Sequence, residues 1–360
     1  MINVLVVEDS RVIRDYLVYI LETDADIRVL GTADSGEAAL AFLATHRPDA
    51  ILMDVHLPGI DGFETTRQIM ASNPVPIVVC TASTQFDQAH TAIRALQVGA
   101  LAVLKKPRGL DDPGAEAEAA AIISTLKLMS EVKVVRRWHQ TPAVATPLAP
   151  ALAGPGPRDD AGHDATVVAI GASTGGPPAV SQILSGLSTA FPVPILVVQH
   201  ICAGFTVAFA EWLATVSGLA VHVAQGGETP LPGHVYVAPD DRHLRVSPRG
   251  ELQTTRDEPH NGLRPSVGIL FRSVAERFGR RAVGVLLTGM GRDGAEELKL
   301  MADRGALTIA QDEQSCVVFG MPAEAIKLGA TRFVFPPHRI AELLSAVVRR
   351  SASEGVTDGQ

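Results

Sequence analysis

Short apolar runs alternate with amphipathic stretches twice along this chain of 360 residues, and this alternation limits the folds that it can adopt. Ten apolar runs have the length of a strand: 2–7, 27–32, 50–55, 76–82, 100–105, 166–172, 194–200, 234–239, 282–289 and 306–312. Helical patterns lie between them, and the clearest are 11–21, 37–44, 177–187, 204–216, 266–278 and 294–304. Buried strands that alternate with helices form parallel sheets with helices on both faces. The pattern therefore predicts an α/β fold with two domains, each built on a doubly wound parallel sheet.

A segment rich in proline and alanine separates the two halves of this pattern. Residues 140–162 hold five prolines, six alanines and three glycines, and they show neither helical nor strand periodicity. Proline lacks a backbone donor and restricts the residue before it, so the segment favours an extended, semi-stiff linker. We expect a first domain at 1–135, a linker at 136–163, a second domain at 164–350 and a flexible tail at 351–360.

Composition and charge exclude several functional classes. The formal net charge of −8 argues against binding of nucleic acid or anionic membranes, and aromatic residues, at 4%, are too few for base-stacking surfaces. No run of about 20 apolar residues is present, so we expect no insertion into a membrane. The first residues lack the cationic and long apolar stretches of a secretory signal, and Cys80, Cys202 and Cys316 form no CxxC pair. We therefore expect a cytoplasmic protein without a disulfide framework.

Three carboxylates, a threonine and a lysine follow the predicted strands of the first domain. Glu8 and Asp9 come after the first strand, Asp54 closes the third, Thr81 the fourth and Lys106 the fifth. Carboxyl ends of parallel strands meet at one edge of a sheet, where three carboxylates repel one another unless a cation such as Mg²⁺ lies among them. A carboxylate beside such a cation can accept a phosphoryl group, and the lysine and hydroxyl can hold the new oxygens. Singly, each acid would be an ordinary helix cap, but the complete set in this order favours a phosphoryl-transfer site.

The first domain resembles the receiver domains of two-component signalling, which have a flavodoxin-like fold. The resemblance is carried by VEDS (7–10), MDVHLPGIDGFE (53–64), Thr81 within CTAS and KKP (105–107). It implies that Asp54 is the phosphorylation site and that Glu8, Asp9 and Asp54 surround Mg²⁺. It also implies that Thr81 and Lys106 sense the phosphoryl group.

A serine lies on a glycine-rich turn at the start of the second domain. Residues 171–176 read GASTGG, follow an apolar run and precede a predicted helix. A dinucleotide fingerprint, GxGxxG, needs glycine where Ser173 stands, because a side chain there blocks the approach of the pyrophosphate. The alternative pattern, GxSxG, places a serine hydroxyl on a tight strand-to-helix turn near backbone N–H groups. Taken alone, such a serine is more often a helix cap than a nucleophile.

A histidine and an aspartate at other strand ends favour the nucleophile. His200 ends one apolar run, and Asp293 lies in the loop after another. Neutral His200 would take the proton of Ser173, while Asp293 would fix the histidine tautomer and stabilise the imidazolium. Backbone N–H groups around Met290 would stabilise a tetrahedral oxyanion. The order Ser, His, Asp differs from the Ser, Asp, His order of ordinary α/β-hydrolases and disfavours that fold.

Each of these residues also has a plain structural interpretation. A histidine at a strand end is usually a structural hydrogen-bonding residue, an aspartate in a loop usually makes a turn, and a methionine usually packs. Four further histidines are expected at the surface: His222, His234, His243 and His260. His243 and His260 are minor candidates for lining the cleft.

The second domain resembles the catalytic domain of the CheB family of chemotaxis protein-glutamate methylesterases, whose fold is Rossmann-like. The resemblance is carried by IGASTGGP (170–177), VVQH (197–200), YVAPDDRHL (236–244), RPSV (264–267), LLTGMGRDGAE (286–296), TIAQDE (308–313) and VVFGMP (317–322). It implies that Ser173 is the nucleophile, His200 the general base and then acid, and Asp293 the orienting acid. Thr174 and the backbone at Met290 are implied as oxyanion stabilisers.

The two resemblances together imply a phosphorylation-regulated methylesterase and glutaminase (deamidase). Its substrates would be methyl-accepting chemoreceptors, its phosphodonor a chemotaxis histidine kinase, and its esterase chemistry would need no cofactor. We expect the unphosphorylated receiver to cover the Ser173 cleft. Two positions depart from the family patterns. Val103 replaces an aromatic residue that is frequent in receivers, which puts the aromatic part of their switch in question, and Gly268 stands where many methylesterases have aspartate.

Three other functions are compatible with parts of the sequence. A transcriptional response regulator would need a basic helix-turn-helix module, whereas the second domain has glycine-rich strand-end loops and the chain is acidic. A protein-interaction module without catalysis is disfavoured by the intact set Ser173, His200 and Asp293. A small-molecule esterase or amidase is the nearest enzymatic alternative.

Overall fold

In the computed structural model the chain forms two compact units, Met1–Val144 and Ala145–Gln360. The structure describes residues 1–81, 91, 94–107, 115–132, 164–201 and 204–354. The predicted linker at 136–163 and the last six residues of the predicted tail lie outside these ranges. Within the described ranges, no helix is both long enough and apolar enough to cross a membrane.

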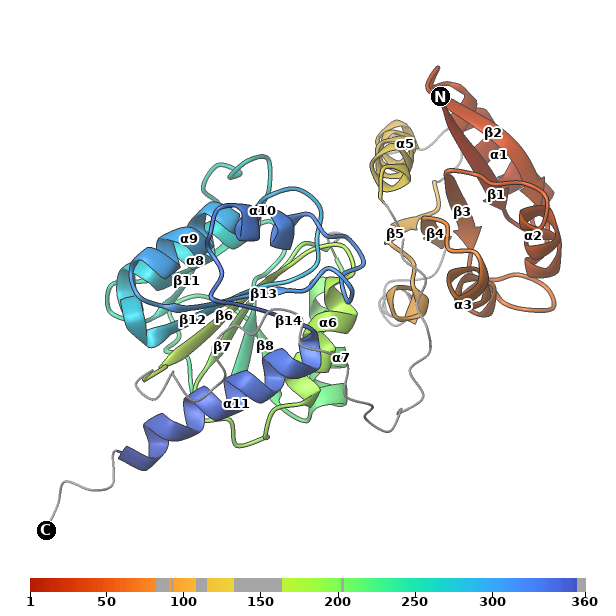
Figure 1. Cartoon of the computed structure of the whole chain (residues 1–360). Coiled ribbons are helices and arrows are strands. Elements are labelled where there is room, and N and C mark those ends of the chain that lie inside the picture. Colours follow the sequence, from red (N-terminus) through yellow and green to blue (C-terminus); the bar gives the residue numbers. More distant parts are fainter. Residues whose placement is uncertain (82–90, 92–93, 108–114, 133–163, 202–203, 355–360) are drawn as a thin grey trace, which may run out of the picture. The chain divides into compact units, whose positions relative to one another are not determined.

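The N-terminal unit is a parallel five-stranded sheet with the order β2-β1-β3-β4-β5 (Figure 1). Its strands are β1 (Ile2–Val7), β2 (Ile27–Ala33), β3 (Ala50–Asp54), β4 (Ile77–Thr81) and β5 (Ala102–Lys105). Its helices are α1 (Arg11–Glu22), α2 (Gly36–Leu43), α3 (Gly62–Ser72) and α5 (Ala115–Ser130), and residues 94–98 are also helical. Every residue of β3 and β4 is buried, as expected for central strands covered on both faces. This strand order is that of flavodoxin-like folds, as predicted.

The C-terminal unit is a parallel seven-stranded sheet with the order β14-β13-β12-β6-β7-β9-β8 (Figure 1). Its strands are β6 (Val167–Ala172), β7 (Ile195–Gln199), β8 (Ala220–Val223), β9 (His234–Val237), β12 (Ala282–Leu286), β13 (Leu307–Gln311) and β14 (Phe333–Phe335). Its helices are α6 (Gly176–Ser185), α7 (Thr206–Ser217), α8 (Val267–Phe278), α9 (Ala295–Asp303), α10 (Met321–Lys327) and α11 (Pro337–Glu354), with a short 3-10 turn at Gly279–Arg281. An antiparallel hairpin, β10 (His243–Val246) and β11 (Leu252–Thr255), lies outside the main sheet.

Two apolar clusters cover the two faces of this larger sheet. Alternate residues of β6 point to opposite faces, so Val168 and Ile170 belong to one cluster while Val167 and Ala169 belong to the other. Helices α6, α7 and α11 complete the first cluster, and α8, α9, α10 and the hairpin complete the second (Figure 1). The prediction of two doubly wound α/β units is therefore confirmed, whereas β8, β14 and the hairpin were not predicted.

The connectivity places a crevice beside the end of β6. Strands β6 and β12 are neighbours, and the chain leaves them in opposite directions along the sheet, from β6 to β7 and from β12 to β13. Where the connections of two neighbouring strands diverge in this way, a crevice opens at their carboxyl ends, and ligands bind there in α/β folds. The loops after β6, β7 and β12 therefore meet at one edge of the sheet.

We predict that the two units unfold in separate transitions, because each has its own sheet and core. Phe209 on α7 is fully buried in the first cluster, so Phe209→Ala should destabilise the C-terminal unit by about 3–5 kcal/mol. Calorimetry of the full chain should show one transition moving down while the other stays in place. The control Val207→Ala, on the exposed side of the same helix, should move neither. A common shift of both transitions would contradict independent cores.

Candidate active site

Ser173 lies on a turn that glycine residues make possible. It follows β6 directly, and its backbone N–H donates to the carbonyl oxygen of Thr288 over 3.0 Å. Gly175 caps α6 with a φ of 76°, in the left-handed region, and a Cβ there would lie 2.4 Å from Cβ of Val317. The backbone therefore turns sharply at a point where a side chain has no space. Ser173 itself is half-buried, so its hydroxyl lies near the surface of the crevice.

His200 is the neighbour of Ser173 on the adjacent strand. Strand β7 pairs with β6 in parallel, with Gln199 opposite Ala172, and each of the two strands ends there. The backbone N–H of His200 donates to the carbonyl oxygen of Ala172 over 2.9 Å. Paired strands lie about 4.8 Å apart, so the next residues, Ser173 and His200, are within side-chain reach.

The buried amide of Gln199 holds these two strand ends together. Its Nε2 donates to the carbonyl oxygens of Ser173 and His200, each over 2.8 Å. Both turns are thus tied to the same side chain, which fixes the relative position of the serine and the histidine.

Asp293 reaches His200 from the loop that follows β12. Its Oδ2 lies 3.0 Å from Nε2 of His200, and it is only 5% exposed. The backbone N–H of Val267 donates to the same Oδ2 over 2.7 Å, while Ser266 Oγ and the backbone N–H of Gly268 donate to Oδ1 over 2.7 and 3.1 Å. These donors form the start of α8, where the helix dipole also favours a negative charge.

The hydrogen bonds keep Asp293 ionised in spite of its burial. Burial alone would raise the pKa of the Asp293 carboxyl, but the hydrogen bond and charge of His200, together with the other donors, outweigh it. The pKa therefore lies below its ordinary value of 3.8. An ionised carboxylate only accepts hydrogen bonds, so Nε2 of His200 must carry the hydrogen that it shares with Asp293.

This contact determines which nitrogen can act as a base. With Nε2 protonated, the lone pair of neutral His200 is on Nδ1. In the usual serine protease arrangement the carboxylate holds Nδ1 and the base is Nε2, so the two nitrogens have exchanged roles here. The sequence predicted the residues but not this orientation of the ring.

The predicted oxyanion residues lie beside Ser173. Buried Thr288 donates from Oγ1 to the carbonyl oxygen of Thr174 over 3.0 Å and accepts from the N–H of Val318 over 2.9 Å. A Cβ added to Gly289 would lie 2.6 Å from Cβ of Ser173, so this loop packs directly against the serine. The structure thus brings Thr174 and the loop of Met290 to the crevice, and their roles as oxyanion donors remain predictions.

One histidine expected at the surface is buried beneath the site. His243 is 0% exposed; its Nδ1 accepts from the backbone N–H of Ser266 over 3.3 Å, and its Nε2 lies 3.1 Å from the carbonyl oxygen of Glu258. Burial is the main cause that lowers the pKa of His243. The prediction of a surface position for His243 is wrong, because β10 packs beneath α8.

His260 is half-buried, with Nδ1 3.1 Å from Oγ of Ser266. His222 and His234 lie at or near the surface, paired over 2.9 Å.

The acidic residues of the N-terminal unit also converge. Glu8 and Asp54 are 1% and 2% exposed, Asp9 is exposed, and one oxygen from each lies within 4.8 Å of the others. Lys106 Nζ lies 2.7 Å from Glu8 Oε2 and 2.9 Å from Asp54 Oδ1, and its backbone N–H donates to the carbonyl oxygen of Thr81. An oxygen-only donor set of this density fits a hard divalent cation such as Mg²⁺.

The pKa of buried Glu8 in this acidic cluster shifts in the opposite direction to that of Asp293. Burial raises the pKa of Glu8 above its ordinary value, and the charge of Asp54 adds to that effect, while the hydrogen bond from Lys106 opposes it. Burial lowers the pKa of Lys106, but its hydrogen bonds to Glu8 and Asp54 outweigh burial and raise it. The cluster thus holds more negative charge than one lysine balances.

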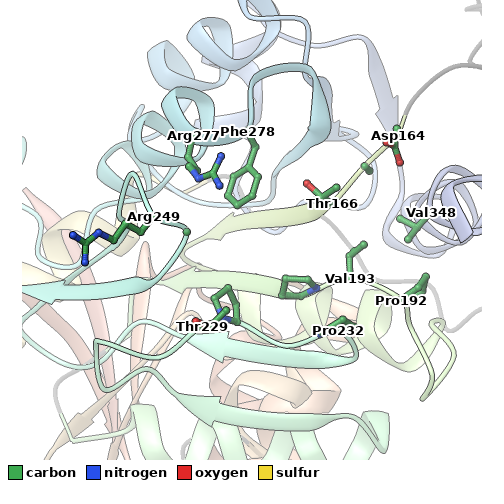
Figure 2. Close-up of a pocket in the computed structure, with 14 residues that line it drawn as sticks. Asp164, Thr166, Pro192, Val193, Thr229, Pro232, Arg249, Arg277, Phe278 and Val348 are labelled. Carbon is green, nitrogen blue, oxygen red and sulfur yellow. The ribbon is translucent and has the colours of Figure 1, made fainter. Parts of the chain in front are cut away.

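A second hollow lies at the opposite edge of the larger sheet. Figure 2 shows Thr166, Val193, Arg277, Phe278 and Val348 around a cavity of about 520 Å³. Residues 164–166 and 192–194 of its lining lie at or before the starts of β6 and β7, so it lies at the amino ends of these strands. None of the predicted catalytic residues lines it.

Comparisons with known proteins find relatives of both units. A model of the CheB methylesterase family matches residues 168–344, and one of the response regulator receiver domain matches residues 4–113. A protein-glutamate methylesterase/protein-glutamine glutaminase of Nitrosospira multiformis is 51% identical over 352 residues, covering 97% of each chain. Another, of Syntrophus aciditrophicus, is 50% identical, covering 96% of this chain and 97% of that one. The crystal structure of the CheB methylesterase catalytic domain of Thermotoga maritima is 38% identical with a TM-score of 0.50, covering 51% of this chain and 99% of that one.

The departure at Gly268 has a spatial cause. A Cβ at this position would lie 2.6 Å from Oε2 of Glu297 and 3.2 Å from Oδ1 of Asp293. Glu297 is buried and paired with Arg272 over 2.9 Å, so a second carboxylate already occupies the place where an aspartate at 268 would project.

We predict that Gly268→Asp destabilises the C-terminal unit by about 1–3 kcal/mol, because it overfills the site and adds a like charge beside Asp293. Adding Glu297→Ala should recover part of that loss, since it removes both the overlap and one charge. Denaturant unfolding of the single and double variants measures the coupling, with exposed Glu296→Ala as the control partner. Additive effects of the two substitutions would contradict this explanation.

Proposed function

Since this chain belongs to the family of protein-glutamate methylesterases/protein-glutamine glutaminases with a receiver domain and a CheB methylesterase domain, we propose how its residues carry out that reaction. The chain is a hydrolase whose activity is regulated by phosphorylation, and it belongs to chemotaxis adaptation. The observation that carries our mechanism is the 3.0 Å contact between Asp293 and His200, at the strand end next to Ser173.

Ser173 is the nucleophile in this mechanism. Its Oγ attacks the carbonyl carbon of a γ-glutamyl methyl ester while Nδ1 of His200 takes the hydroxyl proton. The imidazolium that forms is stabilised by Asp293, which stays ionised. The tetrahedral oxyanion lies against the turn of Thr174 and the loop of Met290, whose N–H groups face developing charge. Collapse breaks the bond to methoxide, which leaves as methanol with the proton from His200.

Water completes the reaction. His200 removes a proton from water as it attacks the acyl-serine, and then returns the proton to Oγ of Ser173. The products are a glutamate carboxylate and the free enzyme. A glutamine side chain follows the same course with ammonia as the leaving group, so one set of residues serves both activities.

Membership of the family supports a proposal for the substrate and the phosphodonor. We propose methyl-accepting chemoreceptors as the substrates, on their cytoplasmic helices, and a chemotaxis histidine kinase as the donor. Each hydrolysis adds a negative charge to the receptor, which suits adjustment of a signalling state. The cytoplasm is the compartment that fits these partners.

The acidic cluster of the N-terminal unit is the proposed phosphorylation site. Glu8, Asp9 and Asp54 would hold Mg²⁺, which supplies charge neutralisation while the phosphoryl group is transferred. Asp54 provides the accepting carboxylate oxygen. Lys106, now bound to Glu8 and Asp54, and the hydroxyl of Thr81 at the same strand edge would hold the new phosphoryl oxygens.

Phosphorylation at Asp54 would regulate access to Ser173. We propose that the unphosphorylated receiver covers the crevice and that the phosphorylated receiver releases it. A change in the covered population from 99% to 1% needs about 5.5 kcal/mol of differential stabilisation, and each tenfold change in activity needs about 1.4 kcal/mol. Val103 in place of an aromatic residue means that any such change does not use an aromatic rotamer at that position.

We predict that Ser173→Ala abolishes methanol release from methylated receptor, reducing the rate by at least 10³-fold, because no other hydroxyl replaces the nucleophile. Ammonia release from a receptor glutamine should fall equally. Ser188→Ala, at an exposed serine of the same unit, is the matched control. Substantial activity in the Ser173 variant would exclude it as the nucleophile.

We predict that a small-molecule phosphodonor with Mg²⁺ activates the full chain and has no effect on Asp54→Asn. The control Asp15→Asn, at an exposed acid of α1, should respond like the native chain. Methanol release and mass spectrometric detection of the phosphorylated chain measure the two effects separately. Equal activation of the Asp54 variant would reject Asp54 as the control site.

A further inference from the structure

We propose that Ser266 is a positioning residue for hydrolysis, oriented by His260, and that the two hold the Asp293 carboxylate in the position that fixes His200. This inference rests on the proposed roles of Ser173, His200 and Asp293. It adds two residues that touch none of the reacting atoms and act through Asp293.

The hydrogen-bond directions in this group follow from the chemistry of its members. Ionised Asp293 has no hydrogen to give, so the 2.7 Å contact at Oδ1 requires Ser266 to donate its hydroxyl hydrogen. Having used that hydrogen, Ser266 Oγ can only accept from its other partners. His260 Nδ1, at 3.1 Å, must therefore be the protonated nitrogen of that ring.

The same logic gives a consistent network around the buried histidine. The backbone N–H of Ser266 donates to Nδ1 of His243, so the hydrogen of neutral His243 is on Nε2, where the carbonyl oxygen of Glu258 accepts it. Ser266 is thus fixed through its backbone by His243 and through its hydroxyl by His260 and Asp293. Donors and acceptors match at every contact, as expected for a rigid buried network.

Ser266 provides half of the side-chain support of Asp293. Among the described side chains, Ser266 and His200 donate to this carboxylate, one to each oxygen. The backbone donors Val267 and Gly268 complete the shell. Without the serine hydroxyl, Oδ1 would keep only the longer contact from Gly268, and the carboxylate could rotate away from Nε2 of His200.

The surrounding charges make this support important. Groups facing Asp293 are His200 beyond β7, His260 with Nδ1 3.9 Å from Oδ1, His243 on β10, and Glu297 on α9 near Gly268. Burial disfavours ionisation of Asp293, whereas the Ser266 donor favours it. Loss of the donor should therefore raise the pKa of Asp293 and weaken its hold on the imidazolium.

Ser266 also caps α8, so the test must separate capping from positioning. Its Oγ accepts from the N–H of Ile269 over 3.4 Å. Glycine at a helix N-cap costs only a few tenths of a kcal/mol relative to serine, so Ser266→Gly removes the donor while largely keeping the helix. Ser266→Thr keeps both the hydroxyl and the cap. Ser273→Ala, at another buried serine of α8 that contacts Leu270 and Val246 instead, is the matched control.

The experiment measures kcat, KM and the pH profile of methanol release by the full chain with methylated receptor. We expect Ser266→Gly to lower kcat by about 10–100-fold, the range seen when outer partners of histidine–carboxylate pairs are removed at metal sites, with KM nearly unchanged. The acid limb of its kcat profile reports protonation of the histidine base, and it should move to lower pH, because a carboxylate that turns away from Nε2 of His200 stabilises the imidazolium less. Ser266→Thr should restore kcat to within about threefold and return the limb. Ser273→Ala should leave the limb in place.

His260→Phe provides the second test, because it leaves the capping hydroxyl of Ser266 and the backbone of α8 in place. It should lower kcat in the same direction and shift the limb less than Ser266→Gly does, while His222→Phe at an exposed histidine should change nothing. If thermal unfolding shows that Ser266→Gly folds poorly, His260→Phe and Ser266→Thr decide the question. A native kcat and an unmoved acid limb in Ser266→Gly would overturn the inference. If Ser266→Gly folds poorly, the same result in His260→Phe would overturn it. An active Ser173→Ala would instead overturn the proposed function.

Discussion

The carboxylate of Asp293 joins three segments that are distant in the sequence, and the chemistry of the C-terminal unit depends on that connection. The loop after β12 supplies the carboxylate, the end of β7 supplies His200, and the start of α8 supplies the donors that keep the charge. Burial by itself would favour the neutral acid, so the donors decide its protonation state. Because the acid is ionised, the imidazole has a defined tautomer, and because β6 and β7 end in register, that imidazole is next to Ser173.

The two units apply the same geometric rule to different chemistry. In each, parallel strands bring short polar loops to one edge, where groups from separate segments converge. In the N-terminal unit, three carboxylates meet one lysine, and the pKa of buried Glu8 is raised. In the C-terminal unit, one carboxylate meets several donors, and its pKa is lowered. Both acids are buried, and the difference comes from their neighbours: the charge of Asp54 raises the pKa of Glu8, whereas His200 and the other donors lower the pKa of Asp293. The first arrangement suits a cation and a phosphoryl group, and the second suits a proton relay.

Much of this architecture was predictable because it depends on local pattern. Buried runs of strand length gave the parallel sheets, and residues at strand ends gave Ser173, His200, Asp293 and the acidic cluster. The hairpin β10–β11 was missed because its strands are short and lie outside the main sheet. His243 was misplaced because its charged neighbours in DDRHL resemble a surface loop, whereas tertiary packing beneath α8 buries it.

Ser266 was not singled out, although a serine before an amphipathic stretch is a recognisable helix cap. Its donation to Asp293, the ring orientation of His200 and the lack of space at Gly268 depend on contacts between distant segments, which one sequence does not reveal.

The tautomer of His200 is the sharpest test of how Asp293 orients the base, because the Asp293 contact determines it. Nitrogen NMR of the full chain with ¹⁵N-labelled histidine, with His200 assigned through its loss in His200→Gln, measures the protonation of each ring nitrogen. We expect neutral His200 to carry its hydrogen on Nε2 and a lone pair on Nδ1, and we expect Asp293→Asn to disturb this state. A hydrogen on Nδ1, unaffected by Asp293→Asn, would contradict the carboxylate-oriented base from which the mechanism is built.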